Sequence, residues 1–146
     1  MAITSAICNS FKQEILEAEH NFTASTGNTF NLALYDSDAT LGAGTTAYTT
    51  SVEITNTSGT TYTAKGKALT SVTPTLDSST AVCDFADVSW TSASFTARGC
   101  LIFNDSHSTD AAVCAIDFGG DKTATSGTFT IQFPAAAAST AIIRIA

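Results

Sequence analysis

Charged side chains are scarce in this sequence. They make up 13% of the residues, which is about half the fraction usual in globular proteins. Lysine and arginine together number only 6, against 13 aspartates and glutamates, so the formal net charge is −7 at pH 7. Nucleic-acid binding depends on clustered basic side chains that contact phosphates. Because the six basic residues are scattered, the composition argues against a nucleic-acid partner.

Metal-binding and disulfide patterns are also missing. No Cys-x-x-Cys pair occurs, and the two histidines, His20 and His107, lie far from any cysteine in the sequence, so we expect no zinc site. Two disulfides are one reading of the four cysteines, but no secretion signal supports an oxidising route. Most of the cysteines lie in apolar runs, where a free thiol behaves as a small hydrophobic side chain. We therefore predict buried free thiols at Cys8, Cys83, Cys100 and Cys114.

Targeting and membrane signals are not found either. The N-terminus has no basic segment followed by an apolar run of signal-peptide length. No apolar run approaches the roughly 18 residues that a membrane-spanning helix needs. We therefore expect no membrane partner, and a chain that is made and first used in the cytosol.

Threonine and serine take the place of the missing charges, and hydrophobic residues make up 44% of the chain. Threonine is β-branched and tolerates water, which is typical of sheets with half-solvated faces. With only two prolines, 146 residues suffice for one hydrophobic core. The composition therefore predicts a folded, β-rich domain.

One amphipathic helix is predicted near the N-terminus. Ser10-Phe11-Lys12-Gln13 has the capping-box pattern, and apolar residues then recur at helical spacing. These are Phe11, Ile15, Ala18 and Phe22. We expect a helix of about three turns, from Phe11 to about Asn21, that packs on a sheet or contacts a partner subunit through Phe11, Ile15 and Phe22.

A period of two replaces the helical pattern from Thr29 onward. Phe30, Leu32 and Leu34 share one face of a strand that we expect to be half-buried. A long surface loop, Asp36–Ala47, follows. Further strands are predicted at Tyr48–Thr55, Thr61–Leu69, Ala81–Trp90, Ser94–Asn104, Ala111–Phe118, Thr128–Phe133 and Ala141–Ile145.

Turn signals separate these strands at Asn56–Gly59, Asp77–Ser79, Asn104–Ser106, Gly119–Asp121 and Ser126–Gly127. Short strands at this spacing, without alternating helices, predict an all-β fold: an antiparallel β-sandwich or small barrel of about eight strands. The run 134–139 is compatible with a helical turn or an extended connector. We interpret residues 1–146 as a single domain, with an N-terminal helical arm (1–24) and a β domain (29–146).

No constellation of residues predicts catalysis. Asp84 with Asp87 and Asp117 with Asp121 are the candidate acid–base pairs, but aspartates at strand ends are more typical of turns. The segment Asp36–Asp38 resembles half of a calcium loop, yet the glycine and glutamate that complete such a loop are absent. We therefore expect no enzyme activity, no catalytic residues, no cofactor and no metal.

Aromatic side chains on the predicted strands are better explained as core than as a ligand platform. Phe129, Ile131 and Phe133 share one strand face, which is typical of a core. The opposite, threonine-rich face is free to form hydrogen bonds with a partner.

Several segments resemble small virion structural proteins of tailed bacteriophages. They are Ser10–Glu14, Thr29–Tyr35, Tyr62–Gly66, Phe95–Asn104, Ala115–Gly119, Thr128–Pro134 and Ala141–Ile145. The resemblance spans nearly the whole chain. It implies a structural component without catalytic residues or cofactor.

Among proteins of this kind, a capsid decoration (cement) protein that binds the major capsid protein lattice and stabilises the shell is the role we expect. It would be located in the virion after assembly in the host bacterial cytoplasm, and a homo-oligomer is compatible with it. The alternatives are a tail, neck or baseplate component, and an adhesive or carbohydrate-binding module at the virion surface.

Overall fold

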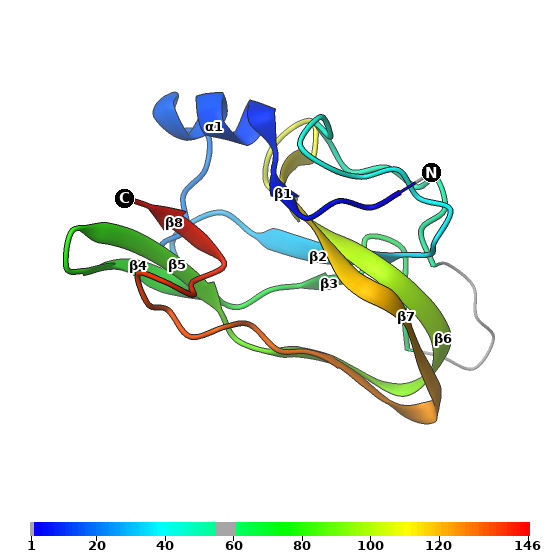
Figure 1. The fold of residues 1–146 in the computed structure, drawn as a ribbon. Coiled ribbons are helices and arrows are strands. Elements are labelled where there is room, and N and C mark those ends of the chain that lie inside the picture. The colour runs from blue at the N-terminus through cyan, green and yellow to red at the C-terminus, as the bar shows by residue number, and fades with distance from the viewer. Residues whose placement is uncertain (1, 55–60) are drawn as a thin grey trace.

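A computed structural model describes residues 2–54 and 61–146. Within these residues the chain forms one short helix and two antiparallel sheets, with strand orders β1-β7-β6-β2-β3 and β4-β5-β8 (Figure 1). The elements are β1 (Ala6–Ile7), α1 (Asn9–Leu16), β2 (Phe30–Tyr35), β3 (Lys67–Ala68), β4 (Ser71–Asp77), β5 (Thr80–Phe85), β6 (Val88–Asn104), β7 (Ala111–Ile131) and β8 (Ile143–Ile145). The predicted all-β sandwich of about eight strands is confirmed. No helix in the described ranges is long and apolar enough to cross a membrane.

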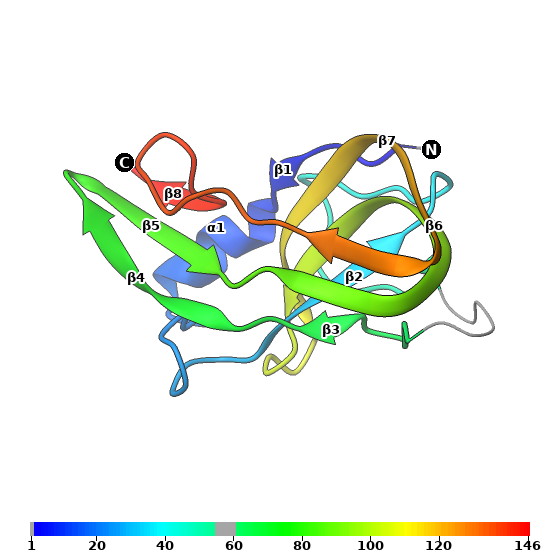
Figure 2. The same ribbon diagram turned by 90° about the horizontal axis from the view of Figure 1, so that it is seen from below.

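The long β6–β7 hairpin determines the shape of the molecule. Its pairing runs from Val88 opposite Ile131 to Asn104 opposite Ala111, with several register shifts between. Such bulges bend a strand pair and increase its twist. The hairpin therefore curls over, so that its two ends lie in different layers (Figures 1 and 2). We call residues 99–104 with 111–117 the upper limb, and residues 88–97 with 122–131 the lower limb.

Two predicted turns are wrong, because β7 continues through both of them. Gly119–Asp121 and Ser126–Gly127 lie inside the strand. Gly119 has a φ of +74° and Ser126 a φ of +47°, which are conformations of a local bulge. At the bend, a Cβ on Gly99 would lie 2.5 Å from the carbonyl oxygen of Ile116, so only glycine fits there. Residues typical of turns thus bend a continuous hairpin here.

The predicted strand Ala81–Trp90 is two strands. β5 ends at Phe85 and β6 begins at Val88. Between them, the Asp87 carboxylate accepts a hydrogen bond of 2.9 Å from the backbone N–H of Phe133. The chain therefore leaves one sheet and enters the other at this point.

Strand β4 was not predicted, because it contains Pro74 and is exposed along its length. Proline is tolerated in edge strands. β4 is the edge of its sheet, and its pairing with β5 is irregular between Val72 and Thr75.

The segment around Tyr48 is held by side chains instead of strand pairing. The prediction of a strand at Tyr48–Thr55 is wrong for its described part, which forms only an isolated bridge from Glu53 to Tyr35. The buried Glu53 carboxylate accepts hydrogen bonds from the hydroxyls of Tyr48 (2.5 Å) and Tyr62 (2.7 Å).

The predicted strands Ser94–Asn104 and Ala111–Phe118 are confirmed as parts of β6 and β7. In two others, only part of the range forms a strand. Of Thr61–Leu69, residues Lys67–Ala68 form β3. Of Ala141–Ile145, residues Ile143–Ile145 form β8. The predicted turn Asn56–Gly59 lies outside the described residues.

Strand β2 is buried on both faces, which corrects the expected half-buried strand. Every residue from Leu32 to Tyr35 is fully buried. One face packs in the core, and the other is covered by the segment that follows β2. There the Tyr35 hydroxyl donates to the carbonyl of Thr49 at 2.6 Å, and Tyr48 stacks on Phe103 with ring centroids 4.8 Å apart.

Helix α1 is shorter than predicted and begins earlier. Its N-cap is Cys8, without a side-chain capping bond, so the predicted capping box is wrong. The backbone N–H of Cys8 instead bonds to the carbonyl of Val113, which ties the start of the helix to β7. The helix ends at Leu16, and Ala18, expected on the apolar stripe, is exposed with a φ of +62°.

A buried histidine, His20, connects the helix to the β6–β7 hairpin through hydrogen bonds. His20 Nε2 lies 2.8 Å from Glu14 Oε2, and its Nδ1 lies 3.1 Å from the side-chain nitrogen of Asn104. An amide nitrogen only donates, so Nδ1 accepts and the Nε2–H donates to the glutamate. His20 thereby joins the helix to the tip of the β6–β7 hairpin.

The N-terminal arm shares the core of the sheets. Phe11 and Phe22 are both buried, with ring centroids 6.0 Å apart in an edge-on arrangement. Phe22 follows the helix in an extended segment and stacks on Phe30 at 4.2 Å. Ile15 is half-buried against the same core.

Replacing Phe11 by alanine should therefore destabilise the whole domain. Large-to-small substitutions of a buried phenylalanine cost about 3–5 kcal/mol. The matched control is Leu16→Ala, in the same helix, whose side chain is 88% exposed. Chemical denaturation should show a large loss of unfolding free energy for Phe11→Ala and almost none for Leu16→Ala. Equal, small losses would mean that the arm does not contribute to the core.

Candidate functional site

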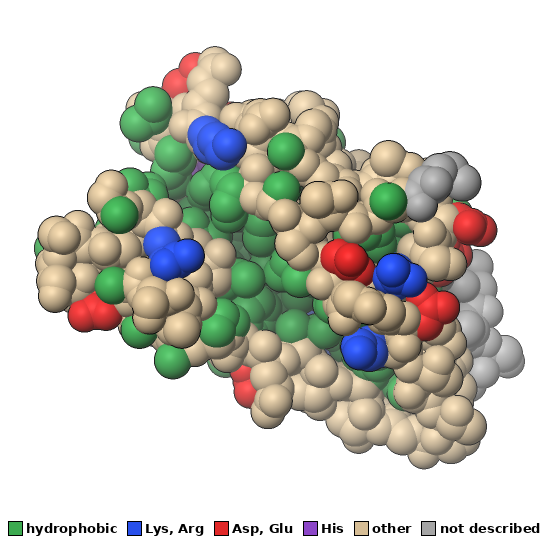
Figure 3. Space-filling view, viewed as in Figure 1, with side chains coloured by type: hydrophobic (Ala, Val, Ile, Leu, Met, Phe, Trp, Pro, Cys, Tyr) green, Lys and Arg blue, Asp and Glu red, His purple; other side chains and the backbone are tan. Residues whose placement is uncertain are grey.

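An open, apolar groove of about 730 Å³ lies between the two limbs of the hairpin; we call it the central groove. Its apolar lining includes Ile116, Phe118, Phe129, Ile131, Phe133 and Ile142. In the space-filling view, hydrophobic side chains gather in a hollow in the middle of this face (Figure 3). Clefts of this size, apolar and accessible from solvent, are typical binding sites.

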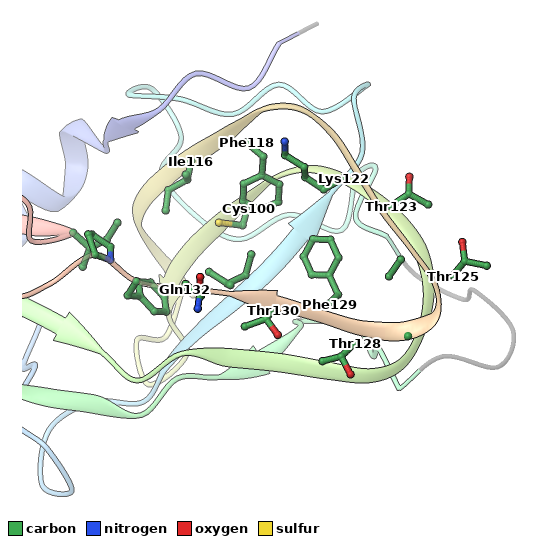
Figure 4. Close-up of a pocket in the computed structure, with 16 residues that line it drawn as sticks. Cys100, Ile116, Phe118, Lys122, Thr123, Thr125, Thr128, Phe129, Thr130 and Gln132 are labelled. Atoms are coloured by element: carbon green, nitrogen blue, oxygen red, sulfur yellow. The ribbon is translucent and has the colours of Figure 1, made fainter.

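The alternation of β7 explains why the groove is apolar. Along the lower limb, the Phe129 side chain points into the groove (Figure 4). Thr123 and Thr128 also contribute to the lining, but their side chains point outward from the strand. The Phe129 ring meets Phe118 of the opposite wall at a centroid distance of 6.3 Å. On the outer face, Thr123 pairs with the Thr96 hydroxyl at 2.7 Å, so part of the threonine-rich face is already hydrogen-bonded within the hairpin.

One edge of β7 is open beside the groove. β1 pairs with β7 only at Cys114 and Ala115. Among the described residues, no strand other than β6 pairs with 118–131. On that stretch, the N–H groups of Gly119 and Ser126 bond to nearby side chains. The remaining outward N–H and C=O groups form an unpaired strand edge, which can accept another strand.

Lys122 is the charged residue that lines the central groove. Its side chain is exposed, and no carboxylate lies within ion-pair distance of it in the described part of the chain. Arg98, by contrast, contacts Asp117 at 3.1 Å and Asp121 at 3.5 Å. A single unpaired ammonium group therefore lies at a groove that is largely apolar and otherwise uncharged.

The aspartates considered as acid–base pairs have structural roles. A hydrogen bond from the N–H of Gly119, together with Arg98, lowers the pKa of the half-buried Asp117. Asp84 accepts from the N–H of the next residue, and Asp36 accepts from the N–H of Asp38. No group of three or more histidine, cysteine, aspartate or glutamate side chains that could hold a metal ion lies within the described ranges.

A second, smaller groove of about 320 Å³ lies between α1 and β8; we call it the helix groove. Phe11 and Ile15 line it, so two of the three residues predicted to contact a partner or pack the arm meet here. Phe22 does not line it and lies in the interior. The groove also carries the most exposed large apolar side chains nearby, Leu16 (88% exposed) and Ile145 (56%). Ile142 lines the central groove, and Ile143, the next residue, lines the helix groove, so the two adjoin.

Family models, curated proteins and solved structures yield no match to this chain. Its function is therefore inferred from the two grooves. The prediction that Phe129, Ile131 and Phe133 belong to the core is confirmed, since Phe129 is buried in the core and the other two pack against it. The sequence analysis did not predict that the same residues also line an open groove. The apolar alternation was the only available signal, and it does not say what the strand faces.

The two histidines lie together in the structure. His107 is half-buried and stacks on His20 at a centroid distance of 6.3 Å. Its Nε2 lies 3.4 Å from Glu19. His107 thus belongs to the contact between the arm and the hairpin tip.

All four cysteines are free thiols, as predicted. Cys8, Cys100 and Cys114 are buried, whereas Cys83, also predicted to be buried, is only half-buried. Burial raises the pKa of Cys8 and of Cys83 to about 11, and that of Cys114 to about 12. Cys100 lines the central groove, and burial raises its pKa as well.

Because these pKa values are raised on folding, the native state favours neutral thiols. Their contribution to stability is complete below the ordinary thiol pKa of 9.0 and is lost as pH rises toward 11. The loss is at most about 1.4 kcal/mol per pH unit for each such thiol. Denaturant unfolding at a series of alkaline pH values should show this decline, and Cys8→Ala should make it shallower. A profile that stays flat from pH 9 to 11 would contradict the burial of the thiols.

Proposed function

We propose that this protein is a non-catalytic structural component that docks onto other protein subunits, and that it does so as a capsid decoration protein. The observation that carries the proposal is the central groove, an open apolar surface bordered by an unpaired strand edge. Exposed apolar patches and long free edges favour association, and soluble proteins usually avoid them unless a partner covers them.

The charge distribution supports a protein partner over nucleic acid. The net charge is −7, and Lys122 is the single basic side chain on the central groove. Phosphate contacts require several lysines or arginines together. An extended apolar groove is instead suited to the side chains of another protein.

Attachment to a repeating lattice fits two adjoining grooves on one small domain. Stable interfaces bury on the order of 1,000 Å² or more, and a domain of this size can provide that area in several contacts. Contacts that are weak one by one become strong when they are made together on one assembly. The whole-chain resemblance to virion proteins of tailed bacteriophages supports the major capsid protein as the partner and the virion, assembled in the bacterial cytoplasm, as the location.

The purified protein should therefore co-sediment with shells assembled from the major capsid protein of the virus that encodes it. Binding should saturate at a fixed ratio to capsid subunits. It should be weak for unassembled subunits, because the lattice supplies the combined contacts. Bound shells should rupture at a higher temperature, since a ligand that prefers the intact state stabilises it by mass action.

Two outcomes would redirect the proposal. Binding to isolated tails and not to shells would indicate a tail, neck or baseplate component. Binding to host-cell glycans in place of shells would indicate an adhesive module. Copy number in purified particles, measured by quantitative gel analysis, separates a lattice component from a tail-tip component.

A further inference from the structure

We propose that the central groove takes an extended segment of a partner protein, which adds a strand to the free edge of β7. The segment places apolar side chains into the groove at alternate positions and a carboxylate against Lys122. This inference rests on the proposed function, because it names the chemistry that the docking surface recognises.

The open edge determines the backbone conformation of the occupant. Within 118–131, residues 122–124, 127 and 129–131 pair with β6 on one side, and no residue of this stretch pairs with another strand of the described chain on the other side. An incoming extended segment can satisfy the outward backbone groups, and strand addition of this kind is a common mode of peptide recognition. A compact small molecule would leave most of these groups unpaired.

The groove determines the side-chain pattern. Successive side chains of a strand point to opposite faces, so every second residue of an added strand faces the groove. There it would contact Phe118 and Ile116 on one wall and Phe129 and Ile131 on the other. The intervening residues would continue the threonine-rich outer face at Thr123 and Thr128, which favours polar side chains at those positions.

Lys122 determines the charge of the occupant. It is the charged residue on the lining, and within the described ranges no carboxylate pairs with it. A carboxylate on the incoming segment would pair with this ammonium group beside an apolar surface. The unpaired Lys122 argues against a second copy of this chain as the occupant. A second copy would place another Lys122 at the edge and would itself carry a net charge of −7, so the two chains would repel each other.

The probe is a synthetic peptide of about ten residues that alternates valine and threonine, with one central aspartate. A matched peptide carries lysine in place of the aspartate. A third peptide keeps every side chain but is N-methylated at alternate amides, which removes the donors on one edge. Each is titrated into the isotope-labelled full chain, followed by NMR and amide hydrogen exchange.

The aspartate peptide should bind at up to millimolar concentration and slow the exchange of alternate amides within 118–131, because only every second N–H faces the open edge. The N-methylated peptide should not. Lys122→Glu should weaken binding of the aspartate peptide roughly tenfold at low salt and reverse the preference toward the lysine peptide. The control Lys12→Glu, on α1 and outside the central groove, should leave both affinities unchanged, and melting curves should show that both variants fold.

Several results would overturn the inference. They are no binding by the aspartate peptide, binding without protection of alternate amides, equal binding of the N-methylated peptide, or dimerisation of the chain through this edge. Occupation of the groove by a fatty acid alone would count against it as well.

The experiments distinguish a failure of this inference from a failure of the proposed function. Shells that bind the protein equally well with saturating peptide would overturn the inference and leave docking intact. A protein that binds the peptide but no shell would retain the inference and lose the decoration role.

Discussion

Continuous backbone pairing between β6 and β7 is the constraint on which the rest of this structure depends. The two strands stay paired from Val88 to Asn104, while bulges at Gly99, Gly119 and Ser126 turn the ribbon over on itself. Because both limbs belong to one hairpin, the two layers are joined covalently and by hydrogen bonds, without a disulfide between the four thiols. In the larger sheet, β1 and β2 add to the upper limb, and β3 adds to β2.

The same bend produces the groove. In the upper limb, β1 pairs with β7 and β2 pairs with β6. In the lower limb, β7 pairs with no strand except β6 among the residues that the structure describes. Its inward residues, such as Phe129, are buried by the opposing wall, and its outer edge stays open. The central groove is therefore a direct consequence of the fold. In the lower limb, β6 can pair with only one edge of β7, so the other edge of β7 stays unpaired beside the groove.

The N-terminal arm closes the opposite side of the core through aromatic contacts. Phe22 stacks on Phe30, and His20 bridges Glu14 and Asn104 across more than 80 residues of sequence. These contacts also shape the helix groove, since Phe11 is held by the core while Leu16 on the same helix is left exposed. The arm is thus at once part of the core and one wall of a surface groove.

The fold class, the free thiols and the alternation that places Phe129 and Ile131 on one face could all be predicted from the sequence. These follow from local composition and a period of two, which need no knowledge of the partner strand. The tertiary structure alone decided whether Gly119–Asp121 is a turn or a bulge, because the same residues serve both and the choice depends on pairing with β6. The end of the helix at Leu16 also depends on tertiary contacts, because His20 forms a hydrogen bond with Asn104 of the hairpin. The burial of β2 on both faces depends on such contacts as well. The central groove could not be predicted, because an apolar strand face has the same sequence pattern whether it packs in a closed core or lines an open groove.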